Sequence, residues 1–239
     1  MTRQILDESF WLEKREIIRN SYEYNEHWAE ILDKFKKRIY DFYFHPIDRV
    51  KDPNKLKGEG FTILTIQCAL IEMFSAFKLG KIHNFAKRGE FPSYEYKKAD
   101  ECFISFLHSE SIFENHFYTY DEANNKQTDL PFNAKEFYNC VRCGLMHEAR
   151  LKGNWVVNAK RKYSITDNLF IKQDSERNKV SIDRTLLNKQ LKSYFSSYLE
   201  KLSNRTIEGQ ELRRLFARKL DHLYNIPEDS INFDWWEDR

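Results

Sequence analysis

An arginine and a histidine on one predicted helix are the residues of this chain best suited to chemistry on a phosphate. Arg142 and His147 lie in the segment Arg142-Cys-Gly-Leu-Met-His147, with four residues between them. The guanidinium of arginine is permanently charged, and its planar fork fits phosphate oxygens. Histidine titrates near neutral pH and can take up or release a proton. Together these groups could promote attack of an RNA 2′-OH on the adjacent phosphate, which gives 2′,3′-cyclic phosphate and 5′-OH ends.

Residues 131–153 are predicted to form the helix that carries both side chains. Asn133, followed three residues later by Glu136, is a capping-box signature at the start. Basic residues occupy the predicted last turn, where they complement the helix dipole, and Gly153 predicts a left-handed stop. The pattern therefore defines both ends of one helix.

This predicted helix has two faces when its residues are placed at about 100° per position. One face is apolar and belongs in a core: Phe137, Val141, Gly144 and Leu145. Glu148 falls on the same face and would need a partner there. The opposite face combines charge, a titratable nitrogen and soft apolar atoms: Asn139, Arg142, Cys143, Met146, His147 and Arg150. Such a mixed face is typical of a cleft wall or a subunit contact.

The Arg-x4-His spacing on a capped helix resembles the signature of the HEPN superfamily, helical-bundle proteins many of which are metal-independent RNases of phage defence and toxin–antitoxin systems. The resemblance covers residues 133–153, with the local sequence VRCGLMHEAR. It implies a dimeric, cytoplasmic endoribonuclease that needs no metal or other cofactor, with Arg142 and His147 as catalytic residues. The same helix face offers supporting or RNA-contacting residues: Asn139, Cys143 and Arg150.

A homodimer is expected because one copy of the motif is chemically incomplete. A single histidine does not easily serve as both base and acid in one turnover, and Arg142 and His147 are about 140° apart on an ideal helix. A two-fold axis at the motif-helix face would place two copies in one cleft. The resemblance implies this arrangement, and a toxin–antitoxin setting would add an inhibitory partner protein.

Other interpretations of the same helix stay open. A HEPN-like module could bind a protein, a nucleotide or RNA without cutting, and Cys143 favours this because the family often has Asn, Asp or His directly after the arginine. Cys140, Cys143 and His147 fall within about 60° of one another and could be zinc ligands. A surface arginine with a half-buried histidine is the structural alternative.

Two further residue groups bear on this site. Glu72 interrupts the apolar stretch 61–78, either as a carboxylate at the edge of a helix face or as the partner that holds the Arg142 guanidinium. Arg38 and His45 form a second Arg–His pair with six residues between them. They straddle a predicted helix end at Pro46, so we favour Arg142 and His147.

The whole-chain composition is that of a soluble, helix-rich protein. The chain has 239 residues, 32% of them charged, a net charge of +2 and a mean hydropathy of −0.73. This balance argues against a general polyanion-coating protein. The four cysteines lack the dense spacing of a disulfide scaffold, and the N-terminus does not resemble a signal peptide, which predicts reduced thiols in the cytoplasm. The stretch 61–77 is expected to be too short and too polar to span a membrane.

Apolar periodicity places the remaining elements of the bundle. Residues 5–44 are predicted to form one long or two short helices, with an apolar stripe of Trp28, Ile31, Leu32, Phe35, Ile39 and Phe42. Helices are also expected over 61–78 and 100–114. Between Lys78 and Lys98, basic residues alternate with aromatic ones, which suits either single-stranded nucleic acid or a solvated linker with its rings in the core.

The C-terminal part changes to short apolar runs that predict a small β-hairpin or winged element. These runs are residues 155–157, 163–165, 169–171 and 180–182. Asp183 is predicted to cap a helix that ends near Leu202, and a last helix covers 210–224 with Arg213, Arg214, Arg218 and Lys219 largely outward. The prediction is a mainly α fold: a HEPN-like helical bundle over 1–153, then the β element and two helices over 154–239, packed on the bundle.

Overall fold

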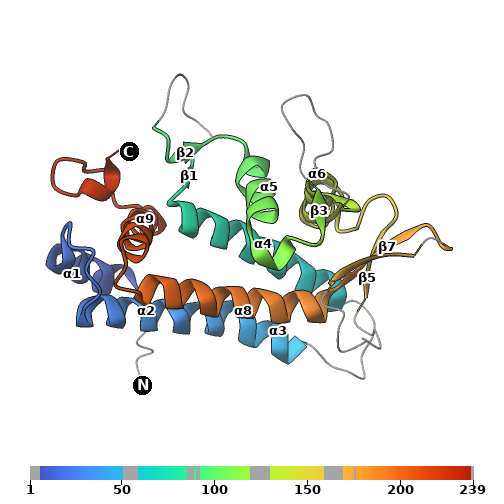
Figure 1. Ribbon diagram of the computed structural model, residues 1–239, viewed down its shortest axis with the longest axis horizontal. Helices are drawn as coiled ribbons and strands as arrows, with labels where there is room; N and C mark the ends of the chain where they lie inside the picture. Colours follow the sequence, from blue (N-terminus) through green and yellow to red (C-terminus); the bar gives the residue numbers. More distant parts are fainter. Residues whose placement is uncertain are drawn as a thin grey trace. The chain divides into compact units, whose positions relative to one another are not determined.

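The structure is a computed structural model of the chain. It describes residues 6–50, 59–84, 89, 92–118, 130–158, 169–174 and 176–237. The fold is mainly α, as predicted, with short strands in small sheets (Figure 1). The contacts divide the chain into two compact units. Unit 1 comprises residues 1–45, 73–99 and 195–239, and unit 2 comprises residues 46–72 and 100–194. Both units are discontinuous in sequence. The predicted boundary between residues 153 and 154 lies inside unit 2, because this unit includes residues 100–194 without a break.

Unit 1 is built from helices at both ends of the sequence. Its elements are α1 (Glu8–Ile18), α2 (Glu26–Ile39), the π-helical turn η1 (Tyr40–Phe44), β1 (Ile82–His83), β2 (Glu95–Tyr96), α9 (Ile207–Leu223) and the 3₁₀ turn η4 (Asp234–Trp236). Parts of α4 (Glu59–Leu79) and α8 (Arg184–Ser203) complete it. Phe35 of α2 lies at the centre, with its ring centroid 4.8 Å from that of Phe77 and 4.9 Å from that of Phe216.

The predicted apolar stripe is buried throughout α2. Its last predicted member, Phe42, lies in the turn after α2 and is exposed. Asn25 caps α2 by accepting hydrogen bonds from the backbone N–H groups of residues 27 and 28. The side chains predicted to face inward are buried from Trp28 through Ile39. Phe42 is instead 46% exposed and Phe44 is fully buried. In η1 the backbone bonds run from i to i+5, so the turn is wider than in an α-helix and a different residue faces the core.

The sequence predicted a helix end at Pro46, but the helix continues past this residue. It continues from η1 directly into α3 (His45–Val50). A proline ring inside an α-helix clashes with the carbonyl of the residue four positions earlier. The π-helical turn directly before Pro46 changes that spacing, and we attribute the continuation of the helix to it.

The C-terminal helix α9 buries cations that were expected to face outward. Arg213, Arg214 and Arg218 are 0%, 4% and 3% exposed. Arg213 donates to the backbone carbonyls of Tyr22 and Asn204, at 2.7 and 2.8 Å, and also to that of Leu202 at the end of α8. These arginines are buried because backbone carbonyls and a carboxylate accept their N–H groups, which a helical periodicity does not reveal.

The described tyrosines of the basic and aromatic stretch face the core, while Lys97 and Lys98 are exposed. Tyr94, directly before β2, and Tyr96, within it, are 2% and 9% exposed, and β2 pairs in parallel with β1. The side chains at 85–88 and 90–91 lie outside the described residues. The described part favours rings packed in the core over rings offered to nucleic acid.

Unit 2 holds the predicted motif helix and the β element. Its elements are most of α4, α5 (Ala99–Ser109), η2 (Ser111–Phe113), β3 (Phe117–Tyr118), β4 (Phe132–Asn133), α6 (Ala134–Glu136), η3 (Phe137–Cys143), α7 (Gly144–Glu148), β5 (Trp155–Asn158), β6 (Ile171–Asp174), β7 (Lys179–Asp183) and the first half of α8. Phe137 anchors the core, with ring centroids of Phe117 and Trp155 at 5.5 and 5.6 Å.

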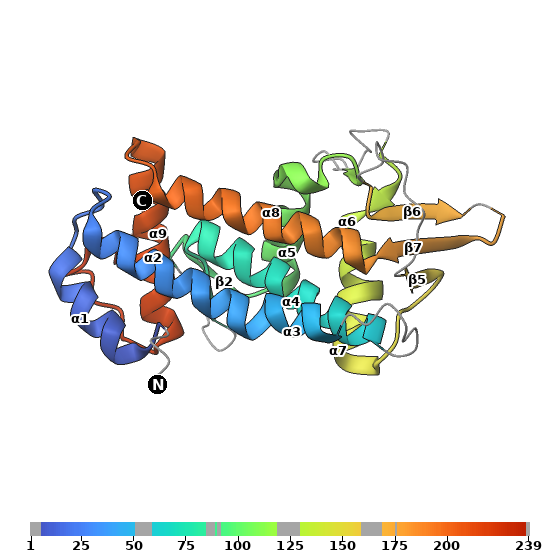
Figure 2. The same cartoon turned by 90° about the horizontal axis from the view of Figure 1, so that it is seen from below.

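The predicted β element is a three-stranded sheet. β7 is its central strand: it pairs antiparallel with β6 in a hairpin and parallel with β5 (Figure 2). The predicted run 163–165 lies outside the described residues. Asp183 accepts hydrogen bonds from the N–H groups of Thr185 and Leu186, both at 2.8 Å, and so caps α8 as predicted. The apolar residues that recur at helical intervals along α8 are all buried: Leu187, Leu191, Tyr194, Phe195, Tyr198 and Leu202.

Helix α4 corrects the expectation that its stretch is too short and too polar to cross a membrane. Over 21 residues it is long and apolar enough by those two measures alone. More than half of its most apolar window is buried inside the protein, as is usual for a core helix. Gln67, one of its interrupting polar residues, is itself fully buried and donates to the backbone carbonyl of Arg184 at 2.6 Å.

Candidate functional site

The motif helix runs without interruption through α6, η3 and α7. Asn133 caps its start, as predicted, because its side chain accepts from the N–H groups of Lys135 and Glu136 at 2.8 and 3.3 Å. The predicted end at Gly153 is wrong. The helix ends at Glu148, and Ala149 takes the left-handed conformation with φ 53°. Gly153 also has a positive φ, of 61°, but it lies in the turn that follows.

The middle of this helix, Phe137–Cys143, is π-helical. The wider turn keeps the predicted core face inside: Phe137, Val141, Gly144 and Leu145 are all buried. Single π-helical turns inside α-helices occur often at functional sites, because they re-aim the side chains around them. Arg142 lies in this stretch, directly before its last residue.

Gly144 lets the chain fold back over the end of the helix. A Cβ atom at this position would lie 2.5 Å from the carbonyl oxygen of Arg150, which is too close for any side chain. The backbone N–H of Arg150 donates to the carbonyl of Gly144 at 3.2 Å, and that of Lys152 donates to the carbonyl of Cys140 at 3.0 Å. These bonds satisfy carbonyls that a helix end leaves open. The turn 149–152 is therefore held directly against the helix.

Arg142 is held by Glu72, as one of the two sequence interpretations proposed. Its Nε and Nη2 atoms donate to the same carboxylate oxygen, Oε2, at 3.3 and 3.0 Å. The two side chains are 17% and 27% exposed. Burial alone would lower the pKa of Arg142, but the nearby Glu72 carboxylate outweighs this and raises it above its ordinary value. The guanidinium is therefore charged at any physiological pH.

One edge of the Arg142 guanidinium is left for another ligand. Glu72 uses Nε and one side of Nη2, while Nη1 makes no hydrogen bond to the described residues. Tyr138, one helical turn earlier, lies with its ring centroid 5.5 Å from the guanidinium carbon. A planar cation held along one edge presents its remaining N–H groups in a set direction. That geometry suits a phosphate oxygen.

Two titratable groups close to Arg142 have pKa values raised well above neutral pH. Burial raises the pKa of the Cys68 thiol to about 12. Burial also raises the pKa of Tyr138 to about 12, although Arg142 opposes the shift. Neither the Cys68 thiol nor the Tyr138 hydroxyl would therefore exchange a proton readily near neutral pH. Sequence reasoning missed Tyr138, whose position four residues before Arg142 is the signal that could have found it.

His147 does not meet Arg142 within one chain. It is exposed, and it makes no hydrogen bond, ion pair or ring contact with the described residues. Arg142 directs its own contacts to Glu72 and Tyr138. The structural alternative expected a surface arginine and a half-buried histidine, but Arg142 is partly buried and His147 is exposed. Arg142 and His147 therefore lie on the same helix but do not contact each other, as their separation of about 140° around an ideal helix predicted.

The other predicted site residues differ in how accessible they are. Asn139 is exposed and Cys143 is half-buried. Arg150 lies beyond the helix end and donates from Nε to Glu148 at 3.1 Å. Glu148 was predicted on the core face, but it is exposed and also pairs with Lys152 at 2.6 Å. The turn 149–152 brings both cations to it, and these two bonds lower the pKa of Glu148.

The zinc alternative gains no support from the geometry. In the part of the chain that the structure describes, no three His, Cys, Asp or Glu side chains come together as metal ligands. Cys140, Cys143 and His147 share a helix, but the first two are half-buried while His147 points to solvent. Zinc would need at least three of them to converge.

The second Arg–His pair is engaged elsewhere. Arg38 donates to the carbonyl of Leu6 at 3.4 Å and covers the ring of Phe42 at 5.2 Å. His45 contacts the carboxylate of Asp41 at 3.2 Å through Nδ1. Each residue has its own local partner, so Arg142 with Glu72 and His147 is the better candidate site.

Comparison of the chain with protein-family models, with curated proteins and with solved structures finds no match.

Proposed function

We propose that this protein is a metal-independent endoribonuclease of HEPN type. The observation that carries the proposal is the geometry of Arg142: a guanidinium held along one edge by Glu72, open along the other, and on the same helix as an exposed histidine. The sequence of that helix, VRCGLMHEAR, resembles the HEPN motif helix. We place the activity in the cytoplasm, in phage defence or in a toxin–antitoxin system with an inhibitory partner protein.

In the proposed reaction the RNA supplies its own nucleophile. Its 2′-OH attacks the adjacent phosphorus, and the bond from phosphorus to the 5′-oxygen breaks. His147 takes the proton of the 2′-OH or gives one to the departing 5′-oxygen. Arg142 binds the phosphate oxygens, on which negative charge grows as the phosphorane forms. The products are a 2′,3′-cyclic phosphate and a 5′-OH.

The proposed active site is shared by two subunits. One His147 does not easily supply both the base and the acid, and within one chain it does not touch Arg142. Met146, which is 51% exposed next to His147, is an apolar side chain suited to burial between two copies of the helix. A two-fold axis there would place two histidines and two arginines around one phosphate.

The test replaces the two motif residues and measures RNA cleavage in chelator with labelled single-stranded oligonucleotides. His147→Ala should lower the cleavage rate by about 100- to 10,000-fold, the usual contribution of positioned acid–base catalysis, and leave RNA affinity nearly unchanged. Arg142→Lys keeps the charge but loses the planar fork, and it should also slow cleavage. Mass spectrometry of the products should show cyclic phosphate ends.

His27→Ala is the matched control, because His27 lies in the first turn of α2 and outside the site. It should cleave at the wild-type rate. If wild-type protein leaves all tested RNA intact but binds it, the chain is a binding module and the catalytic assignment is wrong. If His147→Ala cuts as fast as wild type, cleavage does not use this motif.

A further inference from the structure

The segment that follows α9 is bound to unit 1 through side chains rather than through a helix or strand ladder. It folds back beside α9 and buries Phe233, Trp235 and Trp236, which are 2%, 0% and 5% exposed. Only the short 3₁₀ turn η4 gives it regular structure. Its attachment to α9 passes through Asn225, which has a left-handed φ of 55°. The segment is thus held mainly by the surface that receives it.

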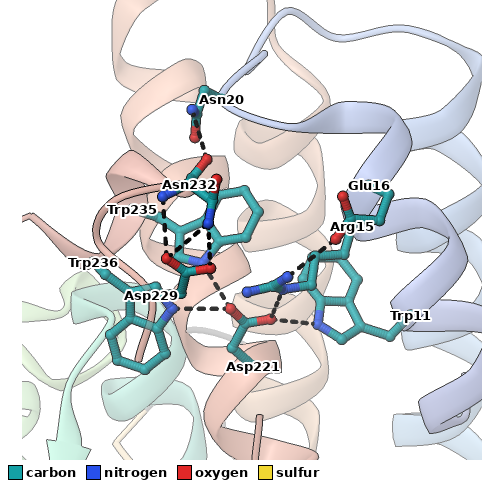
Figure 3. A network of polar contacts seen from close by, with 9 residues as sticks. All are labelled: Trp11, Arg15, Glu16, Asn20, Asp221, Asp229, Asn232, Trp235 and Trp236. Atoms are coloured by element: carbon teal, nitrogen blue, oxygen red, sulfur yellow. Dashed lines mark hydrogen bonds and ion pairs between the residues drawn. The ribbon is translucent and has the colours of Figure 1, made fainter. Parts of the chain in front are cut away.

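Asp221 of α9 recognises the two tryptophans of this segment. Its Oδ2 atom accepts from the indole Nε1 of Trp235 at 2.8 Å and of Trp236 at 3.0 Å. Its Oδ1 atom accepts from Nε1 of Trp11 at 2.8 Å and Nε of Arg15 at 2.9 Å, both on α1 (Figure 3). Asp221 is fully buried. Four N–H donors satisfy this carboxylate, and two of them belong to the segment.

Two side chains of the receiving surface bind the backbone of the segment. The Asn20 amide donates from Nδ2 to the carbonyl of Asn232 at 3.1 Å and accepts through Oδ1 from the N–H of Asp234 at 2.8 Å. Arg218 donates to the carbonyl of Trp235, and its Nη2 donates to that of Glu237 at 3.2 Å. Contacts to backbone groups position a peptide whatever its side chains are.

The aromatic rings of the segment also have defined partners. The guanidinium carbon of Arg15 lies 3.4 Å from the ring centroid of Phe233. The ring of Trp236 packs edge-on against Tyr94, with centroids 5.8 Å apart. Backbone capture combined with separate partners for alternate side chains is how proteins recognise short peptides.

We propose that this surface is a peptide-binding groove specific for the sequence Phe-Asp-Trp-Trp, and that the chain's own segment 229–237 occupies it as a detachable ligand. We name it the tail groove and define it by Trp11, Arg15, Asn20, Arg218 and Asp221. The segment leaves and returns as one unit, pivoting near Asn225. A peptide of the same sequence from a second copy of this chain can replace it.

The tether protects the occupied groove from competitors. A segment joined by a short linker has an effective concentration of about millimolar, so a free peptide would have to exceed this to displace it. A binding test on the wild-type chain alone would therefore miss the groove. Removing the two indoles of the tethered segment weakens its binding to the groove, while the side chains that form the groove stay unchanged.

The experiment uses the full chain with Trp235→Ala and Trp236→Ala and a fluorescein-labelled peptide of residues 229–237. Fluorescence anisotropy should show saturable binding to this variant and at least roughly tenfold weaker binding to wild type, in which the tether competes. Adding Asn20→Ala, which removes both backbone contacts, should weaken peptide binding to the variant. A peptide with both tryptophans replaced by alanine should not bind. A folded variant that does not bind the labelled peptide overturns the proposal.

Hydrogen exchange on the intact wild-type chain tests whether the segment detaches, and it needs no substitution. It therefore tests the proposal even if the double variant does not fold. The N–H groups of Phe233, Trp236 and Glu237 are hydrogen-bonded within the segment. They should exchange together and at least roughly tenfold faster than the central amides of α9. Exchange at the same rate as α9 would mean that the segment opens only when unit 1 unfolds, and it would overturn the proposal.

Discussion

A single carboxylate oxygen of Glu72 accepts two N–H groups of Arg142, and this decides what the arginine can do. The pair is electrically neutral, so Glu72 weakens the attraction of Arg142 for phosphate while it fixes the direction of the open N–H groups. In a nuclease such an arrangement favours positioning over affinity, because only contacts that strengthen in the transition state raise the rate. The ion pair is therefore a test of mechanism as well as of structure.

Glu72→Gln keeps the shape of the side chain and removes its charge. We expect RNA cleavage to slow by about tenfold, while RNA binding becomes equal or tighter, because the negative charge beside Arg142 is lost. The loss of stability should stay near 1 kcal/mol, since both partners are partly exposed. Single-turnover kinetics and filter binding measure the two effects separately.

The matched control for this substitution is Glu148→Gln, which removes an exposed carboxylate on the helix that carries Arg142. It should leave the cleavage rate unchanged. Equal losses of rate in the two variants would show that Glu72 has no specific role. A fall in RNA affinity with Glu72→Gln would contradict the charge argument.

His116 in unit 2 predicts a loss of stability at acidic pH. It is 2% exposed, and its Nε2 accepts from the N–H of Phe170 at 3.1 Å. Burial lowers its pKa from 6.5 to about 4. A lowered pKa in the folded state means that the full stabilisation is present above pH 6.5 and is lost as the pH falls toward 4. The upper limit of this loss is about 3 kcal/mol.

Urea unfolding of wild type and of His116→Gln at pH 7 and at pH 4.5 measures this contribution. Other groups titrate in both proteins, so the difference between them isolates His116. Wild type should lose more stability than the variant on acidification. Parallel losses would show that His116 does not change its protonation on unfolding.

Two residues at the end of the motif helix have opposite requirements. No side chain fits at Gly144, whereas Ala149 has a left-handed backbone conformation that glycine adopts more easily. Gly144→Ala places a Cβ atom 2.5 Å from a backbone oxygen, and it should lower the free energy of unfolding by about 1–3 kcal/mol despite the better helix propensity of alanine. Ala149→Gly relieves a left-handed φ of 53° and should raise it by about 1 kcal/mol.

Chemical denaturation followed by circular dichroism measures both substitutions on the same scale. The opposite signs make each variant the control for the other. If Gly144→Ala were neutral, the turn 149–152 would not be held against the helix as described. If Ala149→Gly destabilised the protein, the end of the helix would lie elsewhere.

The proposed assembly depends on the exposed face of the motif helix. Met146→Glu places a charge in the proposed subunit contact and should convert a dimer to a monomer in light scattering, with a matching loss of cleavage. Leu12→Glu is the matched control, because Leu12 is 42% exposed on α1 in the other unit. It should leave the dimer intact.

A wild-type protein that is monomeric at high concentration would contradict the shared active site. Dimers that persist with Met146→Glu but dissociate with Leu12→Glu would move the contact from the motif helix to α1.

Much of the fold could be predicted from local pattern. The burial of Trp28 through Ile39 in α2, and of the stripe in α8, follows from apolar residues spaced at helical intervals. The caps at Asn133 and Asp183 follow as well, because a capping side chain bonds backbone groups only two or three residues away. Arg142 and His147 could be proposed as candidates for the same reason, because both lie on one short helix whose start the sequence marks.

Contacts between distant parts of the sequence decided the rest. Glu72 and Arg142 are 70 residues apart, and sequence pattern offered their ion pair only as one of two options. Arg213 was predicted to face solvent, yet it is buried because carbonyls from two separate loops accept its N–H groups. Helical periodicity reports where apolar surface repeats, but a buried charge depends on whether its partners meet it in three dimensions, and only the folded chain specifies that.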